Sequence, residues 1–244
     1  MAEHGRALAY CHAAFERGHL TPVAAALAGA ARVFHWRHYP EGDAHDPTTH
    51  AQYFYHAHPL EERGAAPAGE HGHFHTFLRQ GGMPLEARPL VMPELAIAGN
   101  PAAPRAMPAP SAPAGGENDP WTHLVGIAMD RTGRPLRLFT TNRWVTGETW
   151  YAAADTAAAL PRFALRREGD ATILDQWMTA LVGLFRPEIA ALLMARDAAI
   201  VAFRQKHRSR VHVLEDRRLE IASWAPLDID AQRRRVDAAL RHSV

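Results

Sequence analysis

The spacing of apolar positions changes twice along the chain. Between residues 2 and 18 apolar side chains recur at helical spacing, and Pro22 suits the start of a second short helix. Between residues 31 and 150 short runs of apolar and polar residues alternate as in strands, and after Trp150 the helical spacing returns. The pattern therefore predicts an α+β fold, in which N-terminal and C-terminal helices flank a sheet.

The central part contains five segments that are rich in aromatic and β-branched residues and bounded by Gly, Pro or Asp, as strands are. They comprise residues 31–39, 50–58, 69–78, 122–130 and 135–145. We expect an antiparallel sheet of about five strands, the last two joined by a tight turn that contains Gly133. The pattern leaves open whether this sheet curls into a barrel.

The same pattern divides the chain into N-terminal helices (residues 1–30), a histidine-rich sheet (31–150) and a helical part packed on the sheet (151–244). Residues 80–120 hold nine of the 18 prolines. This composition cannot form a packed element, so we expect a long surface loop, a lid or a partly disordered insertion. The three parts together are expected to form one domain.

The charge balance argues against a polyanionic partner. The chain has 27 basic and 26 acidic residues, a formal net charge of +1, so no overall field attracts nucleic acid or an anionic membrane. No apolar run approaches the length of a membrane span, and the N-terminal residues lack the pattern of a signal peptide. We expect a cytoplasmic protein that binds a small-molecule substrate, with a homodimer left open.

Cys11 is the only cysteine. A single thiol excludes an intramolecular disulfide, a cysteine-rich zinc site and an iron–sulfur cluster held by this chain alone. Any bound metal must therefore be held by nitrogen and oxygen atoms.

Five histidines fall in two neighbouring strand segments, YHAH and HGHFH. Alternate side chains share one face of a strand, so the two histidines of an H-x-H pair lie about 6.6 Å apart along the strand and can converge on one ion. If the two strands pair as a hairpin, four histidines surround one point. The expected metal ligands are His56, His58, His73 and His75, with His35 from the preceding strand.

The third histidine of HGHFH needs a separate role. Three alternating histidines span about 13 Å, which is too far for one ion unless Gly72 bends the strand. We expect His71 to act as a further ligand or as a proton shuttle, and a face that holds two metals is the alternative.

The ligand types narrow the choice of cofactor. Imidazole without thiolate suits a divalent metal, and a site with open positions favours Fe(II), with Zn or Cu as alternatives. A network of histidines and tyrosines without metal, or a contact to haem or a nucleotide, also stays open.

Further candidates lie at a polar and aromatic strand end, TTNRWVTGETW. As a continuing strand it places Asn142 and Trp144 on one face, as substrate-binding residues, and Arg143 on the other. The Arg143 guanidinium suits a substrate carboxylate or phosphate, or else pairs with Glu148 or another acid. Arg143 and Glu148 thus join the catalytic candidates.

A second anion anchor is expected before the first H-x-H pair. In FHWRHY, Arg37 and His35 share one face of the expected strand. Arg37 is therefore a substrate-binding candidate beside a metal ligand.

The phrases HYPEGD, QYFYHAH, GEHGHFHTFLR and TNRWVTGETW resemble those of an uncharacterised bacterial family, a domain of unknown function. The resemblance covers roughly residues 34–150 and implies a bacterial source but no activity. The H-x-H strands are also similar to the metal motif of cupins, but no glutamate follows His58 at the usual position. The sequence motifs of nucleotide-binding P-loops, dinucleotide-binding folds, zinc proteases and serine hydrolases are not found.

These observations favour a mononuclear non-haem metal-dependent oxidoreductase that acts on a small polar or anionic substrate. The first alternative is a non-catalytic protein for metal binding or delivery, in which the H-x-H-x-H stretch and the loop 80–120 serve capture and release. The second is a metal-free binding module whose histidines respond to pH.

Overall fold

The computed structural model describes residues 1–28, 30, 32–58, 69–90, 120–167, 169, 171–207 and 210–241. Within these residues six strands form one antiparallel sheet, in which each strand pairs with its neighbours in sequence. The strands are β1 (Tyr39–His45), β2 (Ala51–Ala57), β3 (Glu70–Arg79), β4 (Trp121–Asp130), β5 (Pro135–Thr141) and β6 (Ile221–Pro226). Because β1 and β6 are the two ends of the strand order, the sheet is open rather than a barrel.

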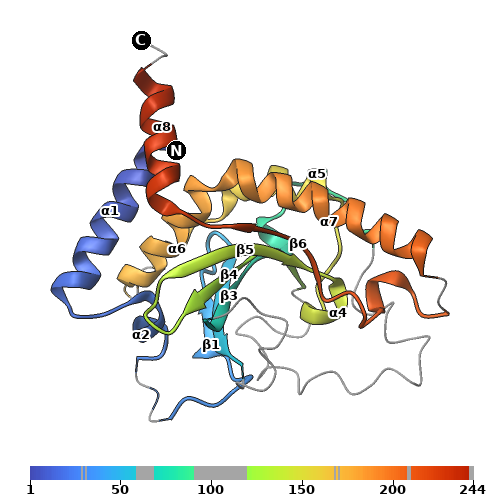
Figure 1. Cartoon of the computed structure of the whole chain (residues 1–244), viewed down its shortest axis with the longest axis horizontal. Helices are drawn as coiled ribbons and strands as arrows, with labels where there is room; N and C mark the ends of the chain where they lie inside the picture. The colour runs from blue at the N-terminus through green and yellow to red at the C-terminus, as the bar shows by residue number, and fades with distance from the viewer. Residues whose placement is uncertain are drawn as a thin grey trace.

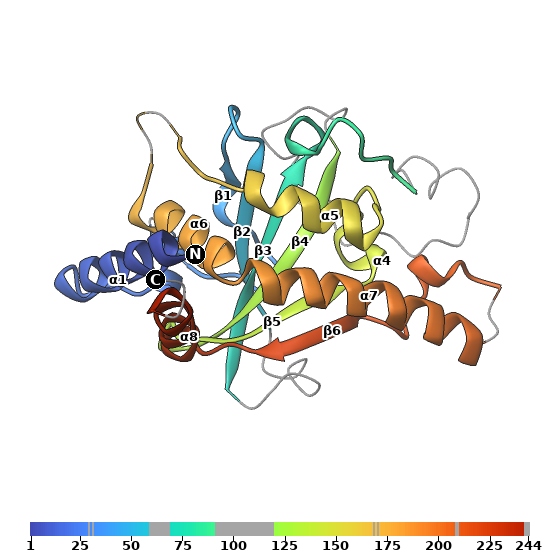
Figure 2. The same ribbon diagram turned by 90° about the horizontal axis from the view of Figure 1, so that it is seen from above.

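Helices cover one face and one end of the sheet. The described helices are α1 (Ala2–Arg17), α2 (Pro22–Ala26), α4 (Arg143–Thr146), α5 (Ala153–Ala159), α6 (Ile173–Leu184), α7 (Arg186–Lys206) and α8 (Ile229–Arg241), with short 3-10 helices η2 (Gln80–Gly82), η3 (Leu160–Arg162) and η4 (Val213–Glu215). In Figure 1, α5 and α7 lie above the strands, α6 lies beside α1, and α1 and α8 stand at one end. Figure 2 shows α5 and α7 crossing over the sheet. The expected α+β class is confirmed.

The helix-covered face carries the apolar core. Cys11 and Phe15, which lie at helical spacing in α1, are buried where α1 packs against α6. Helix α6 begins with a capping box, in which the Thr172 hydroxyl accepts from the backbone of Asp175 and the Asp175 carboxylate accepts from the backbone of Thr172. Asp175 also accepts a hydrogen bond of 3.0 Å from the Tyr53 hydroxyl, which ties α6 to β2.

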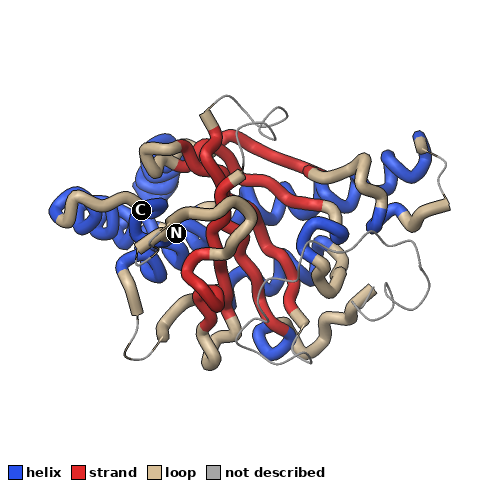
Figure 3. The backbone as a smooth tube through the Cα atoms, turned by 90° about the horizontal axis from the view of Figure 1, so that it is seen from below, coloured by secondary structure: helices blue, strands red, loops and turns tan. Residues whose placement is uncertain are grey.

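The opposite face of the sheet carries histidines and aromatic rings. Tyr53 and Tyr55 of β2 belong to the core under the helices, so the alternating residues Phe54 and His56 point away from it. Strands β2 and β3 pair as expected, with His56 directly opposite His73. Figure 3 views the sheet from below, with the strands in front of the long helices.

Three expectations about the strands were wrong. Residues 32–38 do not form a strand, because Trp36 has a positive φ of 68° that no regular strand allows, and β1 starts only at Tyr39. The last expected strand ends at Thr141. Its continuation turns into α4, where the side-chain oxygen of Asn142 accepts from the backbone of Arg143 as an N-cap. A sixth strand, β6, lies in the part expected to be helical, and it forms at the edge of the sheet by pairing with β5, which is about 80 residues away in sequence.

Of the proline-rich segment 80–120, the structure describes residues 80–90 and 120, which contain η2 and irregular chain. The expectation of a loop or lid over residues 91–119 lies outside the described residues. Among the described helices, none is by itself long and apolar enough to cross a membrane, and α6 and α7 satisfy that test only as a pair bent by 69°.

Candidate metal centre

The side chains of His56, His58 and His73 converge on one point at the face of the sheet opposite to the described helices α5, α6 and α7. The Nε2 atom of His56 lies 2.7 Å from that of His73 and 3.1 Å from that of His58, and the third pair is separated by 3.4 Å. Nitrogens bonded to one ion at about 2.1 Å lie roughly 3.0–3.4 Å apart. The three Nε2 atoms therefore already have nearly the spacing of metal ligands.

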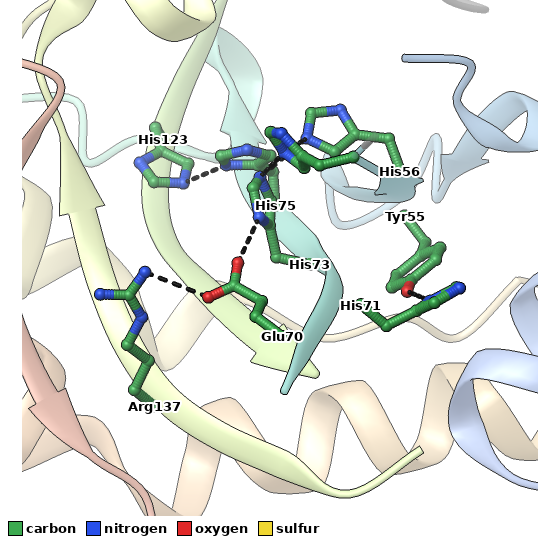
Figure 4. A network of polar contacts seen from close by, with 9 residues as sticks. Tyr55, His56, Glu70, His71, His73, His75, His123 and Arg137 are labelled. Atoms are coloured by element: carbon green, nitrogen blue, oxygen red, sulfur yellow. Dashed lines mark hydrogen bonds and ion pairs between the residues drawn. The ribbon is translucent and has the colours of Figure 1, made fainter. Parts of the chain in front are cut away.

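His75 extends this group along β3. One ring nitrogen from each of His56, His73 and His75 lies within 4.8 Å of the others (Figure 4). His75 is almost wholly buried. On the outer side the Trp36 ring packs edge-on against the group, with its centroid 4.2 Å from that of His58 and 5.7 Å from that of His56. We call His56, His58, His73 and His75 the histidine cluster.

A β-bulge at the start of β3 shifts the alternation of its side chains. Glu70 pairs with Asp130 of β4. Gly72 pairs with the very next residue of β4, Met129, so His71 is an extra residue in β3. An extra residue moves the side chains that precede it in the strand to the opposite face of the sheet. The side chain of Glu70 therefore lies on the same face as the cluster.

The same bulge turns His71 away from the cluster. Its Nδ1 atom lies 2.7 Å from the hydroxyl of Tyr55, a residue of the helix-covered core (Figure 4). A Cβ atom on Gly72 would lie 2.6 Å from that hydroxyl, so glycine is needed for this packing. The expectation that His71 shares a face with His73 and His75 is therefore wrong.

Glu70 supports the cluster from below. Its Oε1 atom lies 3.2 Å from Nδ1 of His73, and Nη2 of Arg137 donates to its Oε2 at 3.1 Å. Burial alone would raise the pKa of Glu70, but its contacts with His73 and Arg137 outweigh burial and lower that pKa. An ionised carboxylate thus holds Nδ1 of His73 in its protonated form and directs Nε2 at the common point, as in carboxylate–histidine–metal arrangements.

A second bulge brings His123 to the same face. Phe77 pairs with His123 rather than with Leu124, which leaves Leu124 as an extra residue in β4. Nε2 of His123 then lies 3.0 Å from Nδ1 of His75. His123 thus contacts the cluster through His75.

Gly126 leaves room for an aromatic wall beside the cluster. A Cβ atom at Gly126 would lie 2.3 Å from the tip of the Phe139 ring, so this ring lies across β4 only because the glycine has no side chain. The centroid of Phe139 lies 5.0 Å from that of His73 and 5.8 Å from that of His75, both edge-on. The ring excludes water from one flank of the cluster.

The buried histidines are held in the neutral form. Burial, together with the neighbouring histidines, lowers the pKa of His56 and of His75 well below the ordinary value. Burial and the charge of Arg196 lower the pKa of His123 to about 3. Neutral imidazoles have the free lone pair that metal coordination requires, so the low pKa values of His56 and His75 favour metal binding by these two residues.

Two candidates from the N-terminal side do not reach the cluster. His35 lies exposed in the turn before β1. The side chain of Arg37 is 62% exposed and lies 3.8 Å from the carboxylate of Glu41. Both positions depended on a strand at residues 31–39, which the structure does not contain.

The candidate residues that follow β5 make structural contacts with the segment before β6. Arg143 is buried and forms an ion pair with Glu215 of η4. Of the two expected roles, a substrate anchor or an ion pair with an acid, the structure shows the ion pair, and the acid is Glu215 instead of Glu148. Asn142 donates to the backbone oxygen of Val213 at 2.9 Å, and the Trp144 indole donates to that of Leu219 at 2.8 Å. All three side chains fasten the segment before β6 to the end of β5.

Glu148 lies deeper, behind His123. Its Oε2 accepts from the backbone N–H of His123 at 2.8 Å, and its Oε1 accepts from the Thr146 hydroxyl at 3.2 Å. Complete burial raises the pKa of Glu148 to about 7, although the charge of Arg196 opposes this rise. The carboxyl contacts the backbone of a residue beside the cluster but none of the cluster side chains.

The fold and the cluster define an α+β protein with a candidate histidine metal centre on the face of its sheet opposite to the described helices α5, α6 and α7. Over residues 2–227 the chain matches a family described as a domain of unknown function, DUF6969, and it belongs to that family. This confirms the resemblance to an uncharacterised family. No curated protein and no solved structure matches the chain.

Proposed function

We propose that this protein is a metal-dependent enzyme in which one divalent ion is held by the histidine cluster. The observation that supports this most directly is the convergence of three Nε2 atoms, of which that of His73 is aimed by a buried carboxylate. A network without metal can place one N–H between two of these nitrogens, but a single proton cannot satisfy three nitrogens that converge on one point, whereas one ion can. The carboxylate support is the arrangement that ligating histidines typically have.

The ligand atoms of the cluster limit which metal ions it can bind. Imidazole nitrogens without thiolate suit Fe(II), Zn and Cu(II). The carboxylate of Glu70 contacts Nδ1 of His73 and Arg137, so it is engaged as a support and the first ligands are neutral. Of the cluster, the three histidines with converging Nε2 atoms, His56, His58 and His73, serve as ligands in the enzyme. They leave positions for a substrate and a small co-ligand such as dioxygen, and Fe(II) therefore stays our preferred ion. The uncompensated charge of the ion favours a small polar or anionic substrate.

Metal analysis tests this proposal. The full chain, purified after growth with iron, zinc, copper and nickel supplied, should contain about one metal per chain, and the apo-protein should unfold at a higher temperature when that metal is added. His56→Ala should abolish both effects, whereas His207→Ala, at a position outside the sheet, should change neither. A wild-type chain that neither contains metal nor gains stability from any of the four ions would contradict the proposal.

A metal-binding or delivery protein is the second candidate, and one observation favours it. A ring nitrogen of His75 lies within 4.8 Å of ring nitrogens of His56 and His73, so His75 would add a fourth imidazole to the three converging ones and complete a tetrahedral shell. Azide titration of the Co(II)-loaded chain separates the two candidates. A change of the visible cobalt spectrum shows a position open to an exogenous ligand, as an enzyme needs, and an unchanged spectrum indicates a saturated shell.

A further inference from the structure

His75 is the member of the histidine cluster whose role the three converging nitrogens leave open. The Nε2 atoms of His56, His58 and His73 lie within hydrogen-bond distance of one another, but among the described residues no such contact joins His75 to them. A ring nitrogen of His75 nevertheless lies within 4.8 Å of ring nitrogens of His56 and His73. His75 is therefore close enough to act on an ion held there, or on a molecule bound to that ion.

Aromatic rings and one further histidine enclose His75, which is 1% exposed. The centroids of Phe54, Phe77 and Phe139 lie 5.3, 6.1 and 5.8 Å from that of His75. In the part of the chain that the structure describes, the His75 ring makes one hydrogen bond, of 3.0 Å, between its Nδ1 atom and Nε2 of His123. Because Nδ1 is engaged in this way, Nε2 is the nitrogen of His75 that remains for the cluster.

Both rings of this pair are neutral. Burial lowers the pKa of His75 well below the ordinary value and lowers that of His123 to about 3. A neutral imidazole has one N–H, so one of its nitrogens donates and the other accepts. The direction of the hydrogen bond between the two rings therefore decides the role of His75. Its Nε2 atom carries either a lone pair, as a metal ligand does, or a proton, as a hydrogen-bond donor does.

The hydroxyl of Thr141 fixes this direction. Its Oγ1 atom lies 3.5 Å from Nδ1 of His123, and both residues are 2% exposed. Across the described residues, this is the one hydrogen-bond contact of the Thr141 hydroxyl. If Nδ1 of His123 carried the proton, the hydrogen of this buried hydroxyl would have no acceptor, which is unfavourable. Nδ1 of His123 therefore accepts, and the N–H of this ring lies at Nε2.

The hydrogen bonds then run in one direction, towards the cluster. Thr141 donates to Nδ1 of His123, Nε2 of His123 donates to Nδ1 of His75, and the proton of His75 lies at Nε2. The backbone N–H of His123 donates to the buried carboxyl of Glu148 at 2.8 Å, which holds His123 in place. A nitrogen that carries a proton has no lone pair to offer an ion. His75 thus faces the cluster with a donor.

We propose that His75 donates a hydrogen bond from Nε2 to an anionic ligand bound at an open position of the ion, and thereby selects anionic over neutral ligands. This inference rests on the proposed metal site and names the class of ligand that the site takes. The ligand is an anion whose metal-bound atom keeps a further lone pair, such as a carboxylate oxygen. Hydrogen bonds to charged acceptors are stronger than those to neutral ones. Thr141 and His123 act through His75 as positioning residues.

Binding of two small ligands to the Co(II)-loaded full chain tests this role of His75. Azide is an anion that keeps lone pairs on its metal-bound nitrogen, whereas the nitrogen of ammonia keeps none once it is bound. His75→Phe removes the donor and leaves a ring of similar size among its aromatic neighbours. We expect the dissociation constant of azide to rise at least about tenfold and that of ammonia to change less than about threefold. The visible cobalt spectrum, recorded at one fixed pH, measures both.

Thr141→Val tests the direction of the hydrogen bonds. It removes the hydroxyl that fixes the proton of His123 but keeps the shape of the side chain, so azide should bind more weakly, by a smaller factor than in His75→Phe. Thr140→Val is the matched control. The Thr140 hydroxyl contacts that of Ser223, which donates to the backbone of α7 on the helix-covered face, so this variant should bind azide like the wild type. Unfolding temperatures of the metal-free variants show that each folds.

Two further measurements locate the proton and count the metal ligands. Long-range proton–nitrogen NMR of the metal-free wild type shows which ring nitrogen carries the proton, and we expect Nε2 in both His75 and His123. Pulsed electron paramagnetic resonance of the Cu(II) form detects coordinated imidazoles. It should give the same number in the wild type and in His75→Phe, because His75 is not a ligand.

The outcomes separate this inference from the proposed function. A proton at Nδ1 of His75 or of His123, azide binding that is unchanged in folded His75→Phe, or the loss of one imidazole in this variant would overturn the inference and leave the metal site standing. If the wild type binds none of the metals, the proposed function fails and the inference fails with it.

Discussion

The Nε2 atoms of His56 and His73 lie 2.7 Å apart on directly paired positions of β2 and β3. Neither residue is adjacent in sequence to the other, and the contact exists because antiparallel pairing places both rings on the same side of the sheet. In the absence of an ion, one of the two nitrogens must carry a proton for the pair to be favourable. A metal that replaces this proton finds its ligands already oriented, so little reorganisation opposes its binding.

Histidines two positions apart in β3 should differ sharply in their effect on metal binding. His73→Ala removes a converging nitrogen, so added metal should no longer raise the unfolding temperature. His71→Ala removes a side chain that faces Tyr55 on the other side of the sheet. It should lower stability but leave the metal-induced increase intact. Thermal unfolding of each apo-variant, with and without metal, measures both effects.

Equal loss of metal binding in the two variants would show that the bulge does not separate His71 from the site. Metal binding retained in His73→Ala, in contrast, would remove this residue from the ligand set.

Glu70→Gln should weaken metal binding without abolishing it. The amide can still accept from Nδ1 of His73 but carries no charge, so the imidazole becomes a weaker base; supporting residues of this kind typically change affinity 10–100-fold. Glu41→Gln is the control, because the Glu41 side chain is 86% exposed. Calorimetric titration with metal measures the difference. An unchanged affinity in Glu70→Gln would show that the carboxylate does not act on the site.

Gly126→Ala should destabilise the fold on the cluster face. The added methyl group overlaps the Phe139 ring, which must move away from His73 and His75, at a cost of about 1–3 kcal/mol in the free energy of unfolding. Gly5→Ala in α1 is the matched control. Its Cβ would meet neighbours only at 3.7 Å or more, so it should stabilise the helix by about 0.5–1 kcal/mol. Denaturant unfolding gives both values, and a neutral Gly126→Ala would show that Phe139 is free to move.

Glu148 should make stability depend on pH around neutrality. Its pKa is raised from 4.5 to about 7 in the folded chain, so the folded state binds more protons than the unfolded state between these values. The contribution of Glu148 is therefore fully present below about pH 4.5 and is lost as pH rises through about 7. Glu148→Gln keeps a carbonyl for the His123 N–H and has no proton to lose.

The stability of Glu148→Gln relative to the wild type should accordingly increase from pH 4.5 to pH 7.5 and level off above it, by an amount on the order of 3 kcal/mol. Urea unfolding of the metal-free chains at a series of pH values measures this difference. A difference that stays constant across the range would mean that the carboxyl is not protonated near neutrality.

Much of the fold is visible in local patterns. The helices α1, α5, α6 and α7 lie where helical spacing predicted them, because each buries one apolar stripe that repeats within its own sequence. The strand expected at residues 31–39 and the missed strand β6 show the limit of such patterns. A strand exists only where a partner accepts its hydrogen bonds, and at the edges of the sheet this depends on residues distant in sequence.

The residues of the site, too, fall into those that the sequence pattern predicted and those that it did not. Period-two alternation by itself predicts that His56 faces His73 once β2 and β3 pair, and this part of the cluster was available from the sequence. The residues that surround it were not. Glu70 and His123 reach the cluster through bulges, and His71 leaves it through one of them. Gly72 in the strand is a sequence signal for such a bulge, but it does not tell which neighbour becomes the extra residue.

The sequence by itself thus determined the α+β class, the donor chemistry without thiolate and, once the two strands pair, a common face for the two H-x-H pairs. Only the tertiary structure decided that Glu70 and Arg137 support the cluster and that Arg143 is occupied by Glu215. The physical reason is that alternation along a strand is a local rule, whereas the place where it breaks is set by packing against other strands. A single inserted residue reverses the face of every residue on its far side.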